Sequence, residues 1–163
     1  IIYSSKTSKI PIIIFSDLIS IVSPIGLFFG RIANFINGEL YGRVTNHYFG
    51  VVFPNGGKLP RHPSQLYEAF FEGLILFFIM VLLMNKSKVF ENKGLLTASF
   101  IFLYGFFRFL IEYFREPDEH IGLIYFDFSM GQILSLPMIV TGLYFIIIFN
   151  NKKIKYWFRF KFT

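Results

Sequence analysis

The stretch MGQILSLPMIVTGLYFIIIF, residues 130–149, decides the fold class. It has no charged side chain and reaches the roughly 20 residues that an α-helix needs to cross a bilayer core about 30 Å thick. Irregular backbone in lipid would leave peptide groups without hydrogen bonds, so a stretch of this kind predicts a transmembrane helix.

Three further stretches have the length and apolar character of membrane spans: residues 10–29, 66–84 and 94–114. With residues 130–149 they predict an all-α integral membrane protein, in which residues 1–163 form a single transmembrane domain with four transmembrane helices.

The composition supports this fold class. Apolar residues make up 54% of the chain and charged residues only 16%, whereas soluble domains have about 25% charged residues. The composition excludes intrinsic disorder and a disulfide scaffold, and it disfavours a soluble enzyme. The sequence has no Cys, and no spacing of His, Asp and Glu resembles a metal site. We therefore expect no metal and no cofactor.

Lys and Arg fall into two groups at alternate ends of the predicted spans. The larger group is nearly all lysine: Lys6, Lys9, Lys86, Lys88, Lys93, Lys152, Lys153, Lys155, Arg159 and Lys161. The smaller group is nearly all arginine: Arg31, Arg43, Lys58, Arg61, Arg108 and Arg115. Cytoplasmic loops carry the excess of basic residues, so we expect the larger group and the tail, residues 150–163, in the cytoplasm. Aromatic residues interleave with the basic ones in this tail, which is typical of a bilayer interface and not of nucleic-acid binding.

A long connection, residues 31–65, joins the first two spans and contains five Gly and three Pro. This composition rules out one continuous helix. Residues 51–53 (VVF), followed by the turn residues PNGG, predict a strand entering a short hairpin. Long loops in compact proteins are usually functional or disordered, and the Tyr, Phe and Val content of this one favours order. We expect it on the periplasmic side.

Polar residues form stripes at helical spacing on the predicted spans. The third span carries Tyr104, Arg108, Glu112 and Arg115, the second Gln65, Glu68 and Glu72, and the first Asp17, Ser20 and Pro24. We expect all three stripes to approach the outer leaflet beside the loop. One interpretation is internal neutralisation, with Arg108 paired to Glu112 and Glu72 to another arginine. The one we favour is a surplus of guanidinium groups that binds an anionic lipid headgroup.

Four motifs identify a family. They are GRIANFINGELYG (residues 30–42), RHPSQLYE (61–68), Arg108 with Glu112 and REPD (115–118), and MGQILS (130–135). Together they resemble the bacterial prolipoprotein diacylglyceryl transferases. The motifs stand in the family's order and cover roughly residues 15–150, which makes the resemblance specific.

The resemblance implies a fold of seven helices, of which this chain would supply the last four; the family's upstream part, with a His-Gly-Gly segment, is absent from this sequence. Family members transfer the diacylglyceryl group of phosphatidylglycerol to the lipobox cysteine thiol in the signal peptide of a preprolipoprotein, the first step of lipoprotein maturation. The implied location is the bacterial inner membrane, with a periplasmic active face and a cytoplasmic C-terminus. The implied partners are phosphatidylglycerol, the preprolipoprotein and the bilayer, with no nucleic acid.

The predicted site combines these motifs with the polar stripes. Arg31 matches the family's phosphatidylglycerol-binding arginine. The predicted catalytic residues are Arg108, Glu39, Glu112 and His62. The predicted substrate-binding residues are Arg31, Asn34, Asn37, Arg61, Gln65, Tyr67 and Arg115. Arg31 and Arg108 are expected on the lipid phosphate, where guanidinium groups stabilise developing charge. Glu39, Glu112 and Arg115 are expected to order the cluster, and His62 is a candidate base or headgroup contact.

Three other functions stay open. An anion transporter element would use the arginine stripe for passage, although the inner halves of the spans are apolar. A non-catalytic or truncated assembly partner would tolerate loss of Arg31 and Arg108. Another lipid-dependent transferase, acting on a polyprenyl phosphate, is compatible with the residue spacing.

Overall fold

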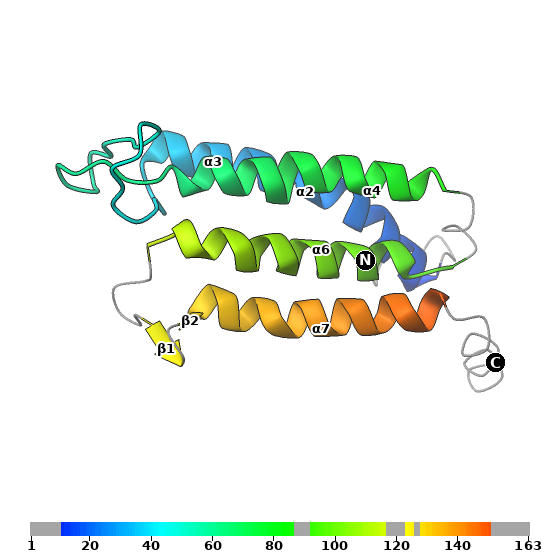
Figure 1. Cartoon of the computed structure of the whole chain (residues 1–163). Coiled ribbons are helices and arrows are strands. Elements are labelled where there is room, and N and C mark those ends of the chain that lie inside the picture. Colours follow the sequence, from blue (N-terminus) through cyan, green and yellow to red (C-terminus); the bar gives the residue numbers. More distant parts are fainter. Residues whose placement is uncertain (1–10, 87–91, 117–122, 126–127, 151–163) are drawn as a thin grey trace.

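Four long helical segments lie alongside one another in the computed structural model, which describes residues 11–86, 92–116, 123–125 and 128–150 (Figure 1). They are α2 (Ile12–Asn37), the continuous run of α3 (Ser64–Glu68), η1 (Ala69–Ile75) and α4 (Leu76–Met84), α6 (Leu95–Ile111) with η2 (Glu112–Phe114), and α7 (Met130–Asn150). Each is long and apolar enough to cross a membrane. The prediction of four membrane spans is confirmed.

The first helix is longer than predicted. It passes residue 29 and ends at Asn37, where Gly38 takes the left-handed conformation (φ 67°) that closes a helix. The chain between Arg31 and Asn37 contains no Gly or Pro, so nothing breaks the helix earlier. Arg31, Asn34 and Asn37 therefore lie on α2 and not in the loop, which begins at residue 38.

The second span contains a π-helical segment, η1, between two α-helical parts. Such wide turns are rare and are found frequently at functional sites. Gly73 lies in this segment against α2, where an added Cβ would stand 2.7 Å from Cβ of Phe28. The absence of a side chain at Gly73 lets the two helices approach closely, as small residues do in membrane proteins.

The last two helices, α6 and α7, pack in the same way. A Cβ on Gly142 would lie 2.6 Å from the backbone nitrogen of Phe102, and one on Gly105 would lie 2.9 Å from Cβ of Met138. Glycine on each helix thus allows backbone contact along this pair.

The N-terminus of α6 is capped by a residue of another helix. Asp17 of α2 accepts hydrogen bonds from the backbone N–H of Gly94 (2.7 Å) and of Thr97 (2.9 Å), and from the Thr97 hydroxyl (2.8 Å). The expected position of Asp17, near the outer stripes, is wrong. It lies at the far end of the bundle from the loop, about 21 Å along the helix from Arg31 at 1.5 Å per residue.

The glycine-rich loop, residues 38–63, projects beyond the end of the bundle where α2 ends and α3 begins (Figure 1). The strand predicted at residues 51–53 is not formed: within these three residues the described backbone has one isolated antiparallel bridge, between Val51 and Arg61. The two-stranded hairpin lies instead before α7, between β1 (Leu123–Tyr125) and β2 (Phe128–Ser129). The tail, residues 151–163, lies outside the described residues.

Arg43 fastens the loop to the end of the third span through two hydrogen bonds. The backbone N–H of Arg43 donates to the Phe114 carbonyl (2.9 Å), and Nε of Arg43 donates to the carbonyl of Arg115 (3.0 Å). The loop is thereby held over the end of the bundle where the predicted site lies.

Candidate functional site

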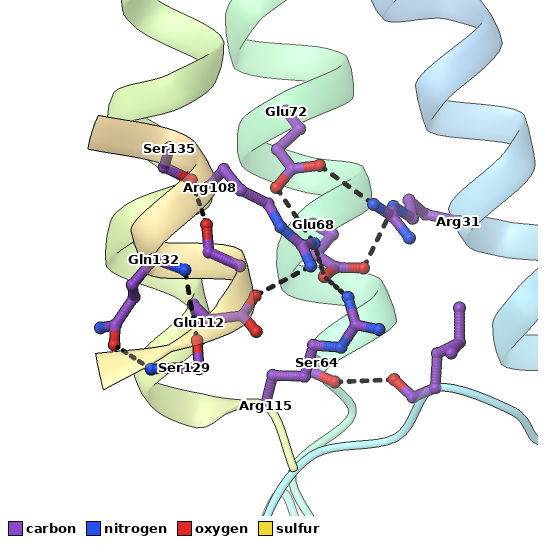
Figure 2. A network of polar contacts seen from close by, with 12 residues as sticks. Arg31, Ser64, Glu68, Glu72, Arg108, Glu112, Arg115, Ser129, Gln132 and Ser135 are labelled. Atoms are coloured by element: carbon purple, nitrogen blue, oxygen red, sulfur yellow. Dashed lines mark hydrogen bonds and ion pairs between the residues drawn. The ribbon is translucent and has the colours of Figure 1, made fainter. Parts of the chain in front are cut away.

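Glu68 is the centre of a buried group of charged side chains (Figure 2). Its side chain is fully buried and contacts three guanidinium groups from different parts of the chain: Nε of Arg31 (3.1 Å), Nη1 of Arg108, and Nη1 of Arg115 (3.7 Å). Arg31 comes from α2, Arg108 from α6, and Arg115 follows η2. One carboxylate thus joins three of the four helical segments.

Two more glutamates complete the group. Glu72, one turn further along the second span, lies 3.5 Å from Nη2 of Arg31 and 3.8 Å from Nη1 of Arg108. The Glu112 carboxylate forms an ion pair with Nη2 of Arg108, 2.8 Å away and four residues earlier in the chain. We call the six residues the arginine–glutamate cluster: Arg31, Arg108, Arg115, Glu68, Glu72 and Glu112.

The cluster is electrically balanced, because three arginines face three glutamates. The expected surplus of guanidinium groups is therefore not found within it, and the internal neutralisation considered for Arg108, Glu112 and Glu72 is observed. Charges at membrane depth are costly and usually occur in pairs. The arginine side chains nevertheless keep 13–16% of their surface exposed, whereas Glu112 keeps 7% and Glu68 and Glu72 keep none. The accessible edge of the cluster is thus cationic.

The start of α7 is shaped to receive Glu112. A Cβ on Gly131 would overlap the Glu112 carboxylate, so a larger residue there would displace this carboxylate from its present position. The Ser129 hydroxyl accepts from the backbone N–H of Gln132 (3.2 Å), and the Gln132 side chain accepts from the backbone N–H of Ser129 (3.1 Å). This reciprocal pair is a capping box. The helix N-terminus that it fixes favours a neighbouring negative charge.

The predicted residues at the end of α2 lie beside the cluster and have contacts of their own. Asn37 donates to the exposed carboxylate of Glu39 at 3.3 Å. The buried side chain of Gln65 donates to the Glu39 carbonyl at 2.7 Å, while its Oε1 has no hydrogen-bond partner among the described residues. The Asn34 carbonyl closes the helix by accepting from the backbone N–H of Glu39. Glu39 has no described ion pair with the cluster arginines.

Arg61 has a different environment from the other predicted arginines. Its guanidinium donates to the carbonyls of Gly56 (2.9 Å) and Gly42 (3.3 Å), pairs with Glu116 (2.8 Å) and stacks over the ring of Tyr41. These contacts fold the loop and connect it to the end of the third span.

His62 and Tyr67 form a separate pair at the mouth of the second span. Nδ1 of His62 lies 3.2 Å from the Tyr67 hydroxyl, and the ring of Phe114 packs against both. Burial lowers the pKa of His62, and the nearby His47 lowers it further. The imidazole is therefore neutral at pH 7 and able to accept a proton. His120 lies outside the described residues.

Sequence reasoning did not include Glu68 and Glu72 among the site residues. Their spacing from Gln65 was visible as a polar stripe, but three arginines distant in the sequence share one carboxylate, and no single helix pattern shows that. Among the described residues, no group of His, Asp and Glu is arranged to hold a metal ion.

The fold and the cluster define a membrane protein whose buried polar site is formed by three of its spans. The sequence model of the family described as prolipoprotein diacylglyceryl transferase matches residues 1–148. The chain belongs to this family, as the four motifs predicted.

Several curated relatives are named phosphatidylglycerol–prolipoprotein diacylglyceryl transferase. Those of Rickettsia akari and Rickettsia conorii are 56% identical to this chain over 144 residues, and these matches cover 88% of the chain and 56% of each relative. That of Rickettsia bellii is 54% identical over 142 residues, with 87% of the chain and 54% of the relative covered. The chain thus spans about half the length of the curated relatives it matches.

Proposed function

We propose that the chain provides the phosphate-binding part of an enzyme that transfers the diacylglyceryl group of phosphatidylglycerol to the lipobox cysteine thiol of a preprolipoprotein. The observation that carries this proposal is the convergence of Arg31, Arg108 and Arg115 on one buried carboxylate near the end of the bundle. Family membership supports it, since the relatives bear the name of this reaction.

The chemistry requires stabilised negative charge and an activated thiol. The cysteine sulfur attacks a glycerol carbon, the bond from that carbon to the phosphate oxygen breaks, and glycerol phosphate leaves. Charge grows on the phosphate oxygens as the bond breaks, and fixed guanidinium groups in a water-poor site stabilise it. The thiolate is the reactive form of the nucleophile. The neutral imidazole of His62 is our candidate for the group that accepts the thiol proton. Its lowered pKa keeps the imidazole unprotonated and thus able to accept it.

A balanced cluster constrains how the lipid binds. Each guanidinium has five N–H donors in a planar fork, and the carboxylate contacts of Arg31 involve Nε and Nη2. The remaining N–H groups of the guanidinium can donate to a phosphate at the exposed edge while Glu68 holds the arginines in place. In this arrangement Arg31 and Arg108 bind the lipid, and Glu68, Glu112 and Arg115 position them.

The orientation we propose follows the distribution of charge. The lysine-rich ends face the cytoplasm, and the cluster and the glycine-rich loop face the periplasm of a bacterial inner membrane. This places the cluster in the outer leaflet, where a signal peptide that has crossed the membrane would present its lipobox cysteine.

The test is complementation in cells depleted of the transferase. The chain is expressed joined to the N-terminal half of a family member, and lipid addition to a test prolipoprotein is followed. We expect transfer by the joined form and none by its Arg31→Ala variant. Lys86→Ala, at the opposite end of the bundle, is the matched control and should transfer normally. A joined form that is inserted in the membrane but inactive would refute the proposal.

The charge balance also favours a second candidate, a non-catalytic assembly partner in which the cluster only holds helices together. In that case Arg31→Ala would leave lipid transfer unchanged in the joined form.

A further inference from the structure

The glycine-rich loop exposes apolar side chains at its outer turn. Tyr48 keeps 82% of its surface exposed, Phe49 55%, Val52 57% and Leu59 59%. Exposed apolar groups gathered in one segment mark a binding surface more often than chance, whereas single ones do not.

The turn that presents these side chains is ordered by its own contacts. The rings of His47, Tyr48 and Phe49 lie within 3.8–5.3 Å of one another, measured between centroids. The backbone N–H of Gly50 donates to the His47 carbonyl at 2.8 Å, and a Cβ on Gly50 would lie 2.9 Å from Pro60. The aromatic side chains are thus held outward by a tight turn that packs on the rest of the loop.

The charged residues of the loop indicate what kind of partner it binds. From residue 40 to residue 60 the sequence has no Asp or Glu, and its charged residues are Arg43 and Lys58, both exposed. An apolar, aromatic and cationic surface is complementary to the headgroup region of a membrane that contains anionic lipids.

The position of the loop at the ends of the helices supports the same partner, a membrane. The outward faces of the spans are apolar up to the loop, and Ile36 in the last turn of α2 is 76% exposed. Helices of about 20 residues fill the hydrocarbon core. The loop begins where α2 ends and stops where α3 begins (Figure 1), so we expect it to start at the level of the headgroups. Tyrosine is enriched at this level because its ring is apolar and its hydroxyl polar.

We propose that the turn of His47, Tyr48 and Phe49, with Val52 and Leu59, inserts into the headgroup region of the outer leaflet and anchors the loop on the bilayer. Arg43 and Lys58 bind anionic headgroups beside it. This proposal is independent of the transfer reaction, since it needs neither the cluster nor a substrate.

Trp157 is the only tryptophan of the chain, so a single indole can report on the turn. The protein with Trp157→Phe and Tyr48→Trp is reconstituted in phosphatidylcholine vesicles, with and without phosphatidylglycerol, in which some of the phosphatidylcholine is brominated. We expect a blue-shifted emission that is quenched strongly by bromines near the glycerol end of the acyl chains, weakly by bromines near the methyl end, and little by iodide in water.

Tyr41→Trp in the same Trp157→Phe background is the matched control. The Tyr41 ring stacks on Phe53 inside the loop, so we expect weaker quenching by bromine there. Adding Lys58→Glu to the Tyr48→Trp protein should reduce the increase in quenching caused by phosphatidylglycerol. Free quenching of the indole at position 48 by iodide would show that the turn lies in water. Shielding from both quenchers would show that protein covers it. Either result overturns the proposal, whatever the outcome of the transfer assay.

Discussion

Glu68 is the carboxylate that pairs with all three arginines of the cluster. If this fully buried carboxylate lost its charge, Arg115 would lose its carboxylate partner among the described residues, and Arg31 and Arg108 would each lose one of theirs. Its role differs from that of Glu112, which pairs with one arginine and lies beside a helix N-terminus.

Replacing Glu68 with Gln should therefore destabilise the bundle. We expect a loss of about 3–5 kcal/mol, the range for breaking a buried charge network by removing one partner, measured by thermal unfolding in detergent. Glu116→Gln is the control, because Glu116 keeps 41% of its surface exposed and, within the described part of the chain, pairs with Arg61 alone; an exposed pair contributes about 0–1 kcal/mol. Equal losses in the two variants would contradict the central role of Glu68.

His62 gives the loop a pH dependence with a definite sign. Its pKa is lowered in the folded protein, first by burial and then by His47, so the unfolded chain binds the proton more tightly. Stability is then complete above the ordinary histidine pKa of about 6.5 and decreases as the pH falls below it.

We expect unfolding temperatures in detergent to fall as the pH is lowered through about 6.5, and His62→Gln to flatten this dependence. His47→Gln, which removes only the smaller cause, should flatten it less. A slope unchanged by His62→Gln would assign the effect to other groups.

Among the elements, α6 depends on a neighbour for its first turn. Gly94 precedes the helix and has no side chain with which to cap it, and Asp17 of α2 supplies the acceptors. Capping residues stabilise a helix by about 0.5–2 kcal/mol.

We expect Asp17→Ala to lower the unfolding free energy by about 1–2 kcal/mol and to leave the KM for phosphatidylglycerol in the joined form unchanged, because Asp17 lies at the far end of the bundle. Ser23→Ala is the control, since the Ser23 hydroxyl bonds only the Ile19 carbonyl of its own helix. A raised KM in Asp17→Ala would mean that the two ends of the bundle are coupled.

The sequence predicted the existence of these elements better than their ends. Apolar runs identify spans reliably, because lipid imposes length and composition. The end of α2 at Gly38 depends on how many of the polar residues after Phe29 are still helical. Hydropathy cannot distinguish a polar residue in a helix from one in a loop. The stripe of Glu68 and Glu72 was visible, but its partners were not, since the three arginines come together only when separate spans pack. The cap by Asp17 was hidden for the same reason.

At the scale of the whole molecule, the four helical segments separate two ends of the bundle. The glycine-rich loop and strands β1 and β2 lie at one end, whereas α4 ends and α6 begins at the other (Figure 1). The lysine and arginine groups predict that these two ends face different compartments.

Cysteine labelling tests the separation directly, because the chain has no Cys. Asn55→Cys in the loop should react with a membrane-impermeant maleimide added to spheroplasts, and Asn85→Cys after α4 should react only once the membrane is permeabilised. Both side chains are exposed, so each is the control for the reactivity of the other. Labelling of both from the same side would refute the four-span topology.

The bond between Asp17 and α6 also bears on how the protein is built during synthesis. The first span enters the bilayer carrying a carboxylate, and the third enters with open amide groups; both are unfavourable in hydrocarbon until they meet. Because the second span lies between α2 and α6 in the sequence, these groups can meet only after α6 has been synthesised. Folding of the bundle is thus tied to the order in which the ribosome delivers its parts.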